Sequence, residues 1–224
     1  SSTTYPISGA LKEKLDGSAD AFVSKLTPDG AAFVFSTYLG GQGLDEGHAI
    51  VADTAGGAWL TGRTESADFP VTDGAMQSKL GGLSDAFVCG LNADGSKLRS
   101  ASFLGGSGVD EGNAIQLDGA GAVHLAGTTR SADFPLERPL KPARRDAAGL
   151  GTSDAFVATL SGDGNRLVFS TCLGGSADDS ASGLAVDAAG DAYLAGRTAS
   201  GDFPASLGAA QPALGGVAVH RPGD

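Results

Sequence analysis

The stretch Asp20-Ala21-Phe22-Val23 decides the fold, because it recurs as Asp85-Ala86-Phe87-Val88 and as Asp154-Ala155-Phe156-Val157. Two further landmarks keep the same spacing. Leu-Gly-Gly begins at Leu39, Leu104 and Leu173, and Asp-Phe-Pro begins at Asp68, Asp133 and Asp202. Successive copies are 65 and then 69 residues apart. Several landmarks in one register indicate an internal repeat.

Each repeat is predicted to hold four short strands in two hairpins. In the best-covered repeat the apolar stretches are His48–Asp53, Ala58–Thr64, Asp85–Leu91 and Lys97–Leu104. They have strand length and contain β-branched and aromatic residues. Gly-Gly or Asp-Gly separates the members of each hairpin and supplies the positive φ that tight turns need. We also expect Asp53, Asp118 and Asp187, which end strands, to form Asx-turns.

Four-stranded antiparallel sheets that repeat along a chain are typical of β-propeller blades. The sequence therefore predicts an all-β protein with about three blades in one segment, residues 1–224. The Phe of each Asp-Ala-Phe-Val is expected in the core, and the Phe of each Asp-Phe-Pro is expected between blades. Partial repeats at both ends, and a blade number below the usual four to eight, predict a propeller that another part or another chain completes.

The repeat resembles a known family. Asp-Ala-Phe-Val, Phe-Ser-Thr-Tyr-Leu-Gly-Gly, Ala-Tyr-Leu-Ala-Gly and Ser-x-Asp-Phe-Pro are similar to the bacterial seven-bladed β-propeller repeat, abbreviated SBBP. The resemblance implies an extracytoplasmic bacterial protein, secreted, periplasmic or on the cell surface, and it supplies no catalytic residues. Two departures stand out: Thr128 replaces the Arg63 and Arg197 of the other repeats, and Cys172 replaces an aromatic residue.

Composition and motifs narrow the function. The chain has 224 residues, of which 36 are glycine. Its hydrophobic content of 41% is too high for a disordered chain. A net charge of −11 argues against binding to nucleic acid, because the phosphate backbone is also negative. No apolar run approaches the ~18 residues of a membrane span. His48, His124 and His220 fall at non-equivalent positions, and no known catalytic motif occurs. We therefore expect no enzyme activity in this segment.

Acidic pairs follow the Leu-Gly-Gly landmarks and are the candidate metal ligands. They are Asp45 and Glu46, Asp110 and Glu111, and Asp178 and Asp179. Adjacent oxygens on a glycine-flanked loop suit Ca²⁺, although the alternating Asp pattern of a dedicated calcium loop is absent. Capped turns and a solvated acidic rim are the other interpretation. No other cofactor is expected.

The insertion after Pro135 carries a basic cluster, Arg138, Lys141, Arg144 and Arg145. On an acidic protein this cluster is either a solvated loop or a docking element for an acidic partner.

The sequence leaves three functions open. The first is a non-enzymatic scaffold or assembly module, with a protein partner or the rest of its own chain completing the propeller. The second is a calcium-dependent carbohydrate or surface-adhesion module. The third is an accessory subunit of a larger complex or filament.

Overall fold

The computed structural model describes residues 5–140, 152–211 and 213–214, and within these ranges the secondary structure is all β. The described residues form twelve strands. Their bounds are β1 Ala21–Leu26, β2 Phe33–Leu39, β3 Asp45–Ala52, β4 Ala58–Thr64, β5 Asp85–Leu91, β6 Leu98–Leu104, β7 Asp110–Leu117, β8 Val123–Thr129, β9 Asp154–Leu160, β10 Leu167–Leu173, β11 Asp179–Val186 and β12 Ala192–Thr198.

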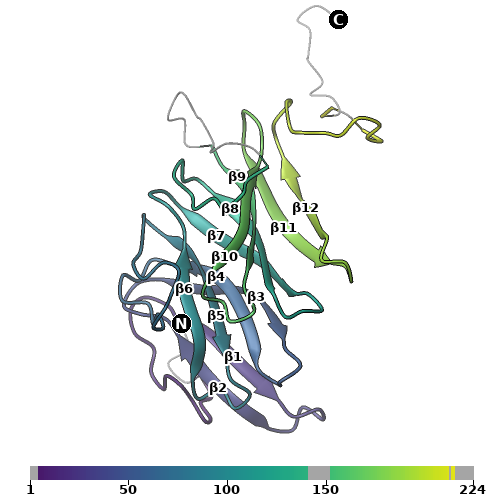
Figure 1. Cartoon of the computed structure of the whole chain (residues 1–224). Coiled ribbons are helices and arrows are strands. Elements are labelled where there is room, and N and C mark those ends of the chain that lie inside the picture. The colour runs from purple at the N-terminus through teal and green to yellow at the C-terminus, as the bar shows by residue number, and fades with distance from the viewer. Residues whose placement is uncertain (1–4, 141–151, 212, 215–224) are drawn as a thin grey trace, which may run out of the picture.

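These strands build two complete sheets and two half-sheets. The complete sheets have the orders β3-β4-β5-β6 and β7-β8-β9-β10, and the half-sheets are β1-β2 and β11-β12. All paired neighbours are antiparallel. The half-sheets lie at opposite ends of the molecule with the complete sheets between them (Figure 1). The predicted antiparallel four-stranded blades are confirmed.

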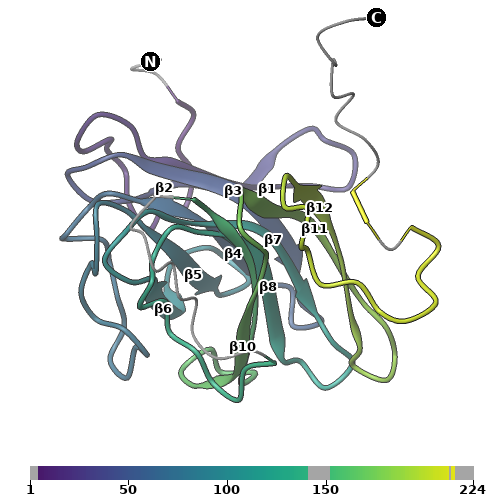
Figure 2. The same cartoon turned by 90° about the horizontal axis from the view of Figure 1, so that it is seen from above.

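The first strands of successive sheets pack beside one another. Strand β7 contacts β3 and β4 of the preceding sheet, and β11 contacts β7 and β8 in the same way. In the view from above, β3, β7 and β11 gather toward the middle, whereas β2, β6 and β10 lie outside (Figure 2). We therefore call β3, β7 and β11 the inner strands. The order of strands from the inside outward follows the order of the chain in both complete sheets.

The core fills the space between sheets, as neighbouring blades require. Phe87 and Phe156 are fully buried. Phe69 stacks on Phe87 with ring centroids 4.7 Å apart, and Phe134 stacks on Phe156 at 4.6 Å. Each such ring contributes about 1.5–3 kcal/mol by burial. The expected placement between blades holds for Phe69 and Phe134, but the third Asp-Phe-Pro ring, Phe203, is 37% exposed. Phe22, the third expected core ring, is 61% exposed.

The hairpin turns follow the predicted chemistry. Gly95 has a φ of 72°, which favours glycine, and Asp94 accepts a hydrogen bond from the Ser96 amide at 2.9 Å. Asp53 Oδ1 accepts hydrogen bonds from the amides of Ala55 at 3.0 Å and Gly57 at 2.8 Å. Asp118 and Asp187 repeat this arrangement. The Asx-turn prediction is confirmed.

Strand β3 begins earlier than the sequence suggested. We expected it to start at His48, but it starts at Asp45 because the ladder to β4 continues through Asp45 opposite Thr64. The Asp45 amide also donates to the Ala19 carbonyl at 2.8 Å. Strand β7 begins at the equivalent Asp110. The acidic pairs at these two places therefore lie within strands, where successive side chains point to opposite faces.

Candidate functional site

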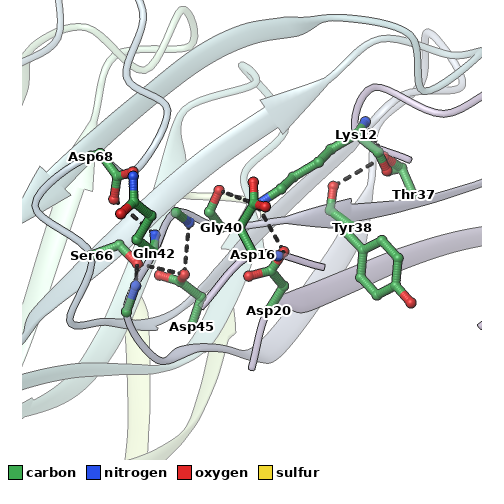
Figure 3. A network of polar contacts seen from close by, with 12 residues as sticks. Lys12, Asp16, Asp20, Thr37, Tyr38, Gly40, Gln42, Asp45, Ser66 and Asp68 are labelled. Atoms are coloured by element: carbon green, nitrogen blue, oxygen red, sulfur yellow. Dashed lines mark hydrogen bonds and ion pairs between the residues drawn. The ribbon is translucent and has the colours of Figure 1, made fainter. Parts of the chain in front are cut away.

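A buried aspartate holds each loop that leads from one sheet to the next. Asp110 Oδ2 accepts hydrogen bonds from the Gly106 amide at 2.8 Å and from the Ser131 hydroxyl at 2.6 Å. The Asp110 side chain is fully buried. The same pattern joins Asp45 to Gly41 and Ser66, which Figure 3 shows from close by, and Asp179 to Gly175 and Ser200.

The Ser-x-Asp of each Ser-x-Asp-Phe-Pro binds the same loop from the other side. Ser66 Oγ accepts the Gly43 amide at 2.8 Å, and Asp68 Oδ1 accepts the Gln42 amide at 2.9 Å. Equivalent bonds recur at Ser131 and Asp133, and at Ser200 and Asp202. The distant landmarks of the repeat are therefore parts of one structural unit, which we call the joint between sheets.

The aspartate of Asp-Ala-Phe-Val is the second carboxylate of each joint. Asp85 Oδ2 accepts hydrogen bonds from the Gly81 amide at 2.8 Å and from Gln77 Nε2 at 2.6 Å. A Cβ on Gly105 would lie 2.7 Å from Asp85 Oδ1 and 2.7 Å from Asp110 Oδ2, so only glycine fits between the two carboxylates. Gly40 and Gly174 occupy the same place in the other joints.

The first joint contains its own cation. Lys12 Nζ lies 2.8 Å from Asp20 Oδ2 and donates a hydrogen bond to the Gly40 carbonyl at 2.8 Å. Figure 3 shows Lys12 reaching across to Asp20. The neutral Gln77 is the equivalent residue of the second joint, 65 positions later. Burial, together with the nearby charge of Asp110, raises the pKa of Asp85 above its ordinary value. Burial likewise raises the pKa of Asp110.

The structure does not bring the predicted acidic neighbours together. Asp45 is buried in its joint, whereas Glu46 is exposed and lies 3.9 Å from His48 Nε2. Glu111 Oε1 lies 3.2 Å from Arg63 Nη1 of the preceding sheet. Asp178 accepts hydrogen bonds from the Ser153 amide and hydroxyl, which lowers its pKa. In the part of the chain that the structure describes, no three His, Cys, Asp or Glu side chains gather in a way that could hold a metal ion.

Only one member of the basic cluster can be placed. Arg138 is exposed, and its Nε donates to the Val168 carbonyl at 3.0 Å. The predicted docking residues Lys141, Arg144 and Arg145 lie outside the described residues, as does His220. The docking hypothesis for this cluster therefore stays a prediction.

One histidine does lie in a chain of polar contacts. His124 Nε2 is 3.2 Å from Asp118 Oδ2, and His124 Nδ1 is 3.1 Å from the Thr159 hydroxyl. His124 is only 4% exposed, and the three residues tie β8 to β9 and to the end of β7. We interpret this arrangement as a structural contact between neighbouring strands.

The half-sheets expose surfaces that are buried elsewhere in the repeat. Tyr193 on β12 is 61% exposed, whereas Trp59 at the same place on β4 is 3% exposed. On the opposite half-sheet, Phe22 of β1 is exposed where Phe87 is buried. A groove of about 510 Å³ runs between β1 and β3, and its lining includes Phe22, His48 and Ile50. Both flanks are therefore open sheet edges with apolar residues.

Comparison with known families supports the propeller repeat. The family model of the SBBP β-propeller repeat matches residues 34–70 and 168–204. Each match runs from an outer strand through a joint to the following Asp-Phe-Pro. The chain thus carries SBBP β-propeller repeats at two regions, as the sequence predicted. No curated protein matches the chain. Among the described residues, no helix is long and apolar enough to cross a membrane.

Proposed function

We propose that these propeller repeats serve as a non-enzymatic scaffold for assembly, and that the open edges of β1 and β12 are its binding surfaces. The proposal rests on a difference in solvent exposure between β12, in a half-sheet, and β4, the equivalent strand of a complete sheet. Gly62 and Thr61 on β4 are buried, because β5 pairs beside β4 and β7 of the neighbouring sheet packs against it. Their equivalents on β12, Gly196 and Ala195, are exposed. A complementary strand pair would cover them.

The polar chemistry of the repeat supports a structural role. The buried carboxylates accept loop amides and serine hydroxyls, so their charge is used to hold sheets together. Both ring nitrogens of the buried His124 likewise contact polar side chains, Asp118 in the turn after β7 and Thr159 on β9. We place the scaffold outside the cytoplasm of a bacterium, following what the resemblance to the SBBP repeat implies.

The proposal is tested by supplying a hairpin for the open edge of β12. Leu214-Gly215-Gly216 corresponds to Leu80-Gly81-Gly82, so a copy of residues 83–104 can replace residues 217–224 in register. We expect the added hairpin to protect the β12 amides from hydrogen exchange and to raise the melting temperature. The matched control carries Asp at the copied Phe87 position, which prevents burial of that ring. Unchanged exchange along β12 in the extended chain would contradict the proposal.

A further inference from the structure

Each inner strand packs closely against the second strand of the preceding sheet. Strand β7 contacts β3 and β4, and β11 contacts β7 and β8 in the same way. At the first of these two interfaces, a Cβ on the buried Gly112 would overlap Thr61 Oγ1 and would lie 3.1 Å from Thr61 Cβ. The three nearest atoms that this Cβ would meet all belong to Thr61, and Gly112 does not have a positive φ. The glycine therefore makes room for the threonine of the neighbouring sheet.

At the second interface both residues of this pair are different. The residue equivalent to Thr61 is Ala126, and the residue equivalent to Gly112 is Ala181. Ala126 and Ala181 are buried in one cluster of small residues. The side chain on the second strand is thus smaller where the side chain on the inner strand is larger, so the two sizes change together.

The charged residues of the two interfaces change together as well. Arg63 Nη1 on β4 lies 3.2 Å from Glu111 Oε1 on β7. The equivalent positions of the second interface hold Thr128 on β8 and Ser180 on β11. Both charges are absent there, so neither interface contains half of the ion pair. The matching explains why Thr128 departs from the arginine of the other repeats.

A β-bulge in each inner strand supplies a third matched contact. The ladder to the second strand skips His48 on β3 and Asn113 on β7, and a bulged residue can aim its side chain away from the ladder. His48 Nδ1 lies 3.1 Å from the Gly112 carbonyl of the next sheet. Asn113 Nδ2 donates to the Ala181 carbonyl at 2.9 Å. It also donates to Thr128 Oγ1 at 3.2 Å, a bond that an arginine could not accept.

We propose that these matched positions form a pairing code between sheets, so that each sheet accepts the sheet that follows it in the chain and rejects the others. The first set is Thr61, Arg63, Glu111 and Gly112, and the second set is Ala126, Thr128, Ser180 and Ala181. Crossing the two sets would press Thr61 against an alanine and leave Arg63 without its carboxylate. Wrong pairing between similar copies is a characteristic failure of repeat proteins, and specificity against it needs such mismatches. The code acts within one chain, so it holds whether or not the open edges bind a partner.

The size match is tested by a double-mutant cycle in urea. Gly112→Ala should raise the equilibrium constant for unfolding about tenfold or more, because its Cβ overlaps Thr61 Oγ1. Adding Thr61→Ala should restore much of the stability, since the two Cβ atoms then need to move apart by only a few tenths of an ångström. Gly119→Ala is the matched control, because its Cβ would meet nothing within 4 Å. If Gly112→Ala has the same effect with and without Thr61→Ala, the inference is wrong.

The second interface provides the reciprocal cycle, which also decides the matter if Gly112→Ala does not fold. Ala126→Thr should lower the melting temperature, because Ala126 is fully buried in the same cluster as Ala181. Adding Ala181→Gly recreates the pair of the first interface and should recover most of the loss. Ala181→Gly in the unaltered chain should lower the melting temperature slightly, because glycine loses more freedom on folding. A double variant as unstable as the two single losses combined would count against the code.

Transplanting the second set into the first interface tests the code as a unit. Glu111→Ser with Gly112→Ala gives β7 the residues of β11 while β4 keeps Thr61 and Arg63, and this half-transplant should have the lowest melting temperature. Adding Thr61→Ala and Arg63→Thr completes the set and should raise it. His48→Asn should raise it further, because the new amide can donate to the new threonine, as Asn113 does. A complete transplant that melts no higher than the half-transplant would overturn the pairing code.

Discussion

Lys12 and Gln77 occupy the same position in successive repeats, and each contacts the aspartate of an Asp-Ala-Phe-Val. The lysine places a positive charge beside Asp20 and Asp16. The glutamine leaves Asp85 and Asp110 without one. We therefore expect Gln77→Lys to raise the free energy of unfolding at pH 7 by on the order of 1 kcal/mol, measured in urea. Lys12→Gln should lower it, and a loss of stability in Gln77→Lys would contradict the equivalence of the two joints.

The same joint predicts a pH dependence. A carboxyl whose pKa is raised by folding holds its proton more tightly in the native state. Its contribution is fully present below the ordinary carboxyl pKa of 3.8 and is lost as the pH rises through the raised value. The advantage of Gln77→Lys over the unaltered chain should therefore be greatest near neutral pH and shrink toward pH 3.8. An advantage that grows on acidification would reverse this assignment.

Removing a serine hydroxyl from a joint should lower the free energy of unfolding. Ser131 is 1% exposed, donates to Asp110 at 2.6 Å and accepts the Gly108 amide at 2.9 Å. Ser131→Ala leaves the buried carboxylate and the amide each short of one partner, and we expect a loss of about 1–3 kcal/mol in the free energy of unfolding. Ser96→Ala, in an exposed turn, provides the comparison and should cost less. Equal losses would show that the joint is not a special site.

The two Asp-Phe-Pro rings at Phe69 and Phe203 should respond differently. Phe69 is 3% exposed and stacks on Phe87, whereas Phe203 is 37% exposed. Phe69→Ala should cost about 3–5 kcal/mol, as for other buried aromatic residues. Phe203→Ala should cost much less. Thermal and urea unfolding of the two variants measure the difference, and similar costs would mean that Phe203 is buried in solution.

Calcium dependence is directly testable. Oδ2 of Asp45 and of Asp110 already accepts an amide and a hydroxyl hydrogen bond, so we expect neither millimolar Ca²⁺ nor EDTA to change the melting temperature. A ligand that binds the native state would raise it by mass action. A calcium-dependent rise that disappears in Gln77→Lys would instead place an ion at the Asp85 and Asp110 joint.

The spacing of the repeat landmarks was sufficient to predict the fold but not the contacts within the joints. Recurrence of Asp-Ala-Phe-Val and the Asp-Gly turns predicted the sheets and the hairpins, and recurrence of Asp-Phe-Pro predicted that Phe69 lies between blades. The roles of Ser66 and Lys12 were missed, because they depend on hydrogen bonds between segments far apart in the chain. Their shared offsets from Ser131 and Gln77 were the available signal. The start of β3 at Asp45 was missed because the glycines before it indicated a loop, whereas the pairing with β4 extends the strand.

The exposure of Phe22 could not be predicted from its own repeat. The three Asp-Ala-Phe-Val copies are alike in sequence, and only the presence of a strand beside β5 and β9 distinguishes Phe87 and Phe156 from it. Burial in such an array depends on neighbours more than on the local residues.

The joints also determine how the chain would respond to force. Each joint links the end of one sheet to the beginning of the next through a few hydrogen bonds of ordinary length. A molecule stretched between its ends should rupture in discrete steps, each releasing about one repeat of slack. Such a design lets a pulled chain dissipate energy gradually and keep its remaining sheets intact.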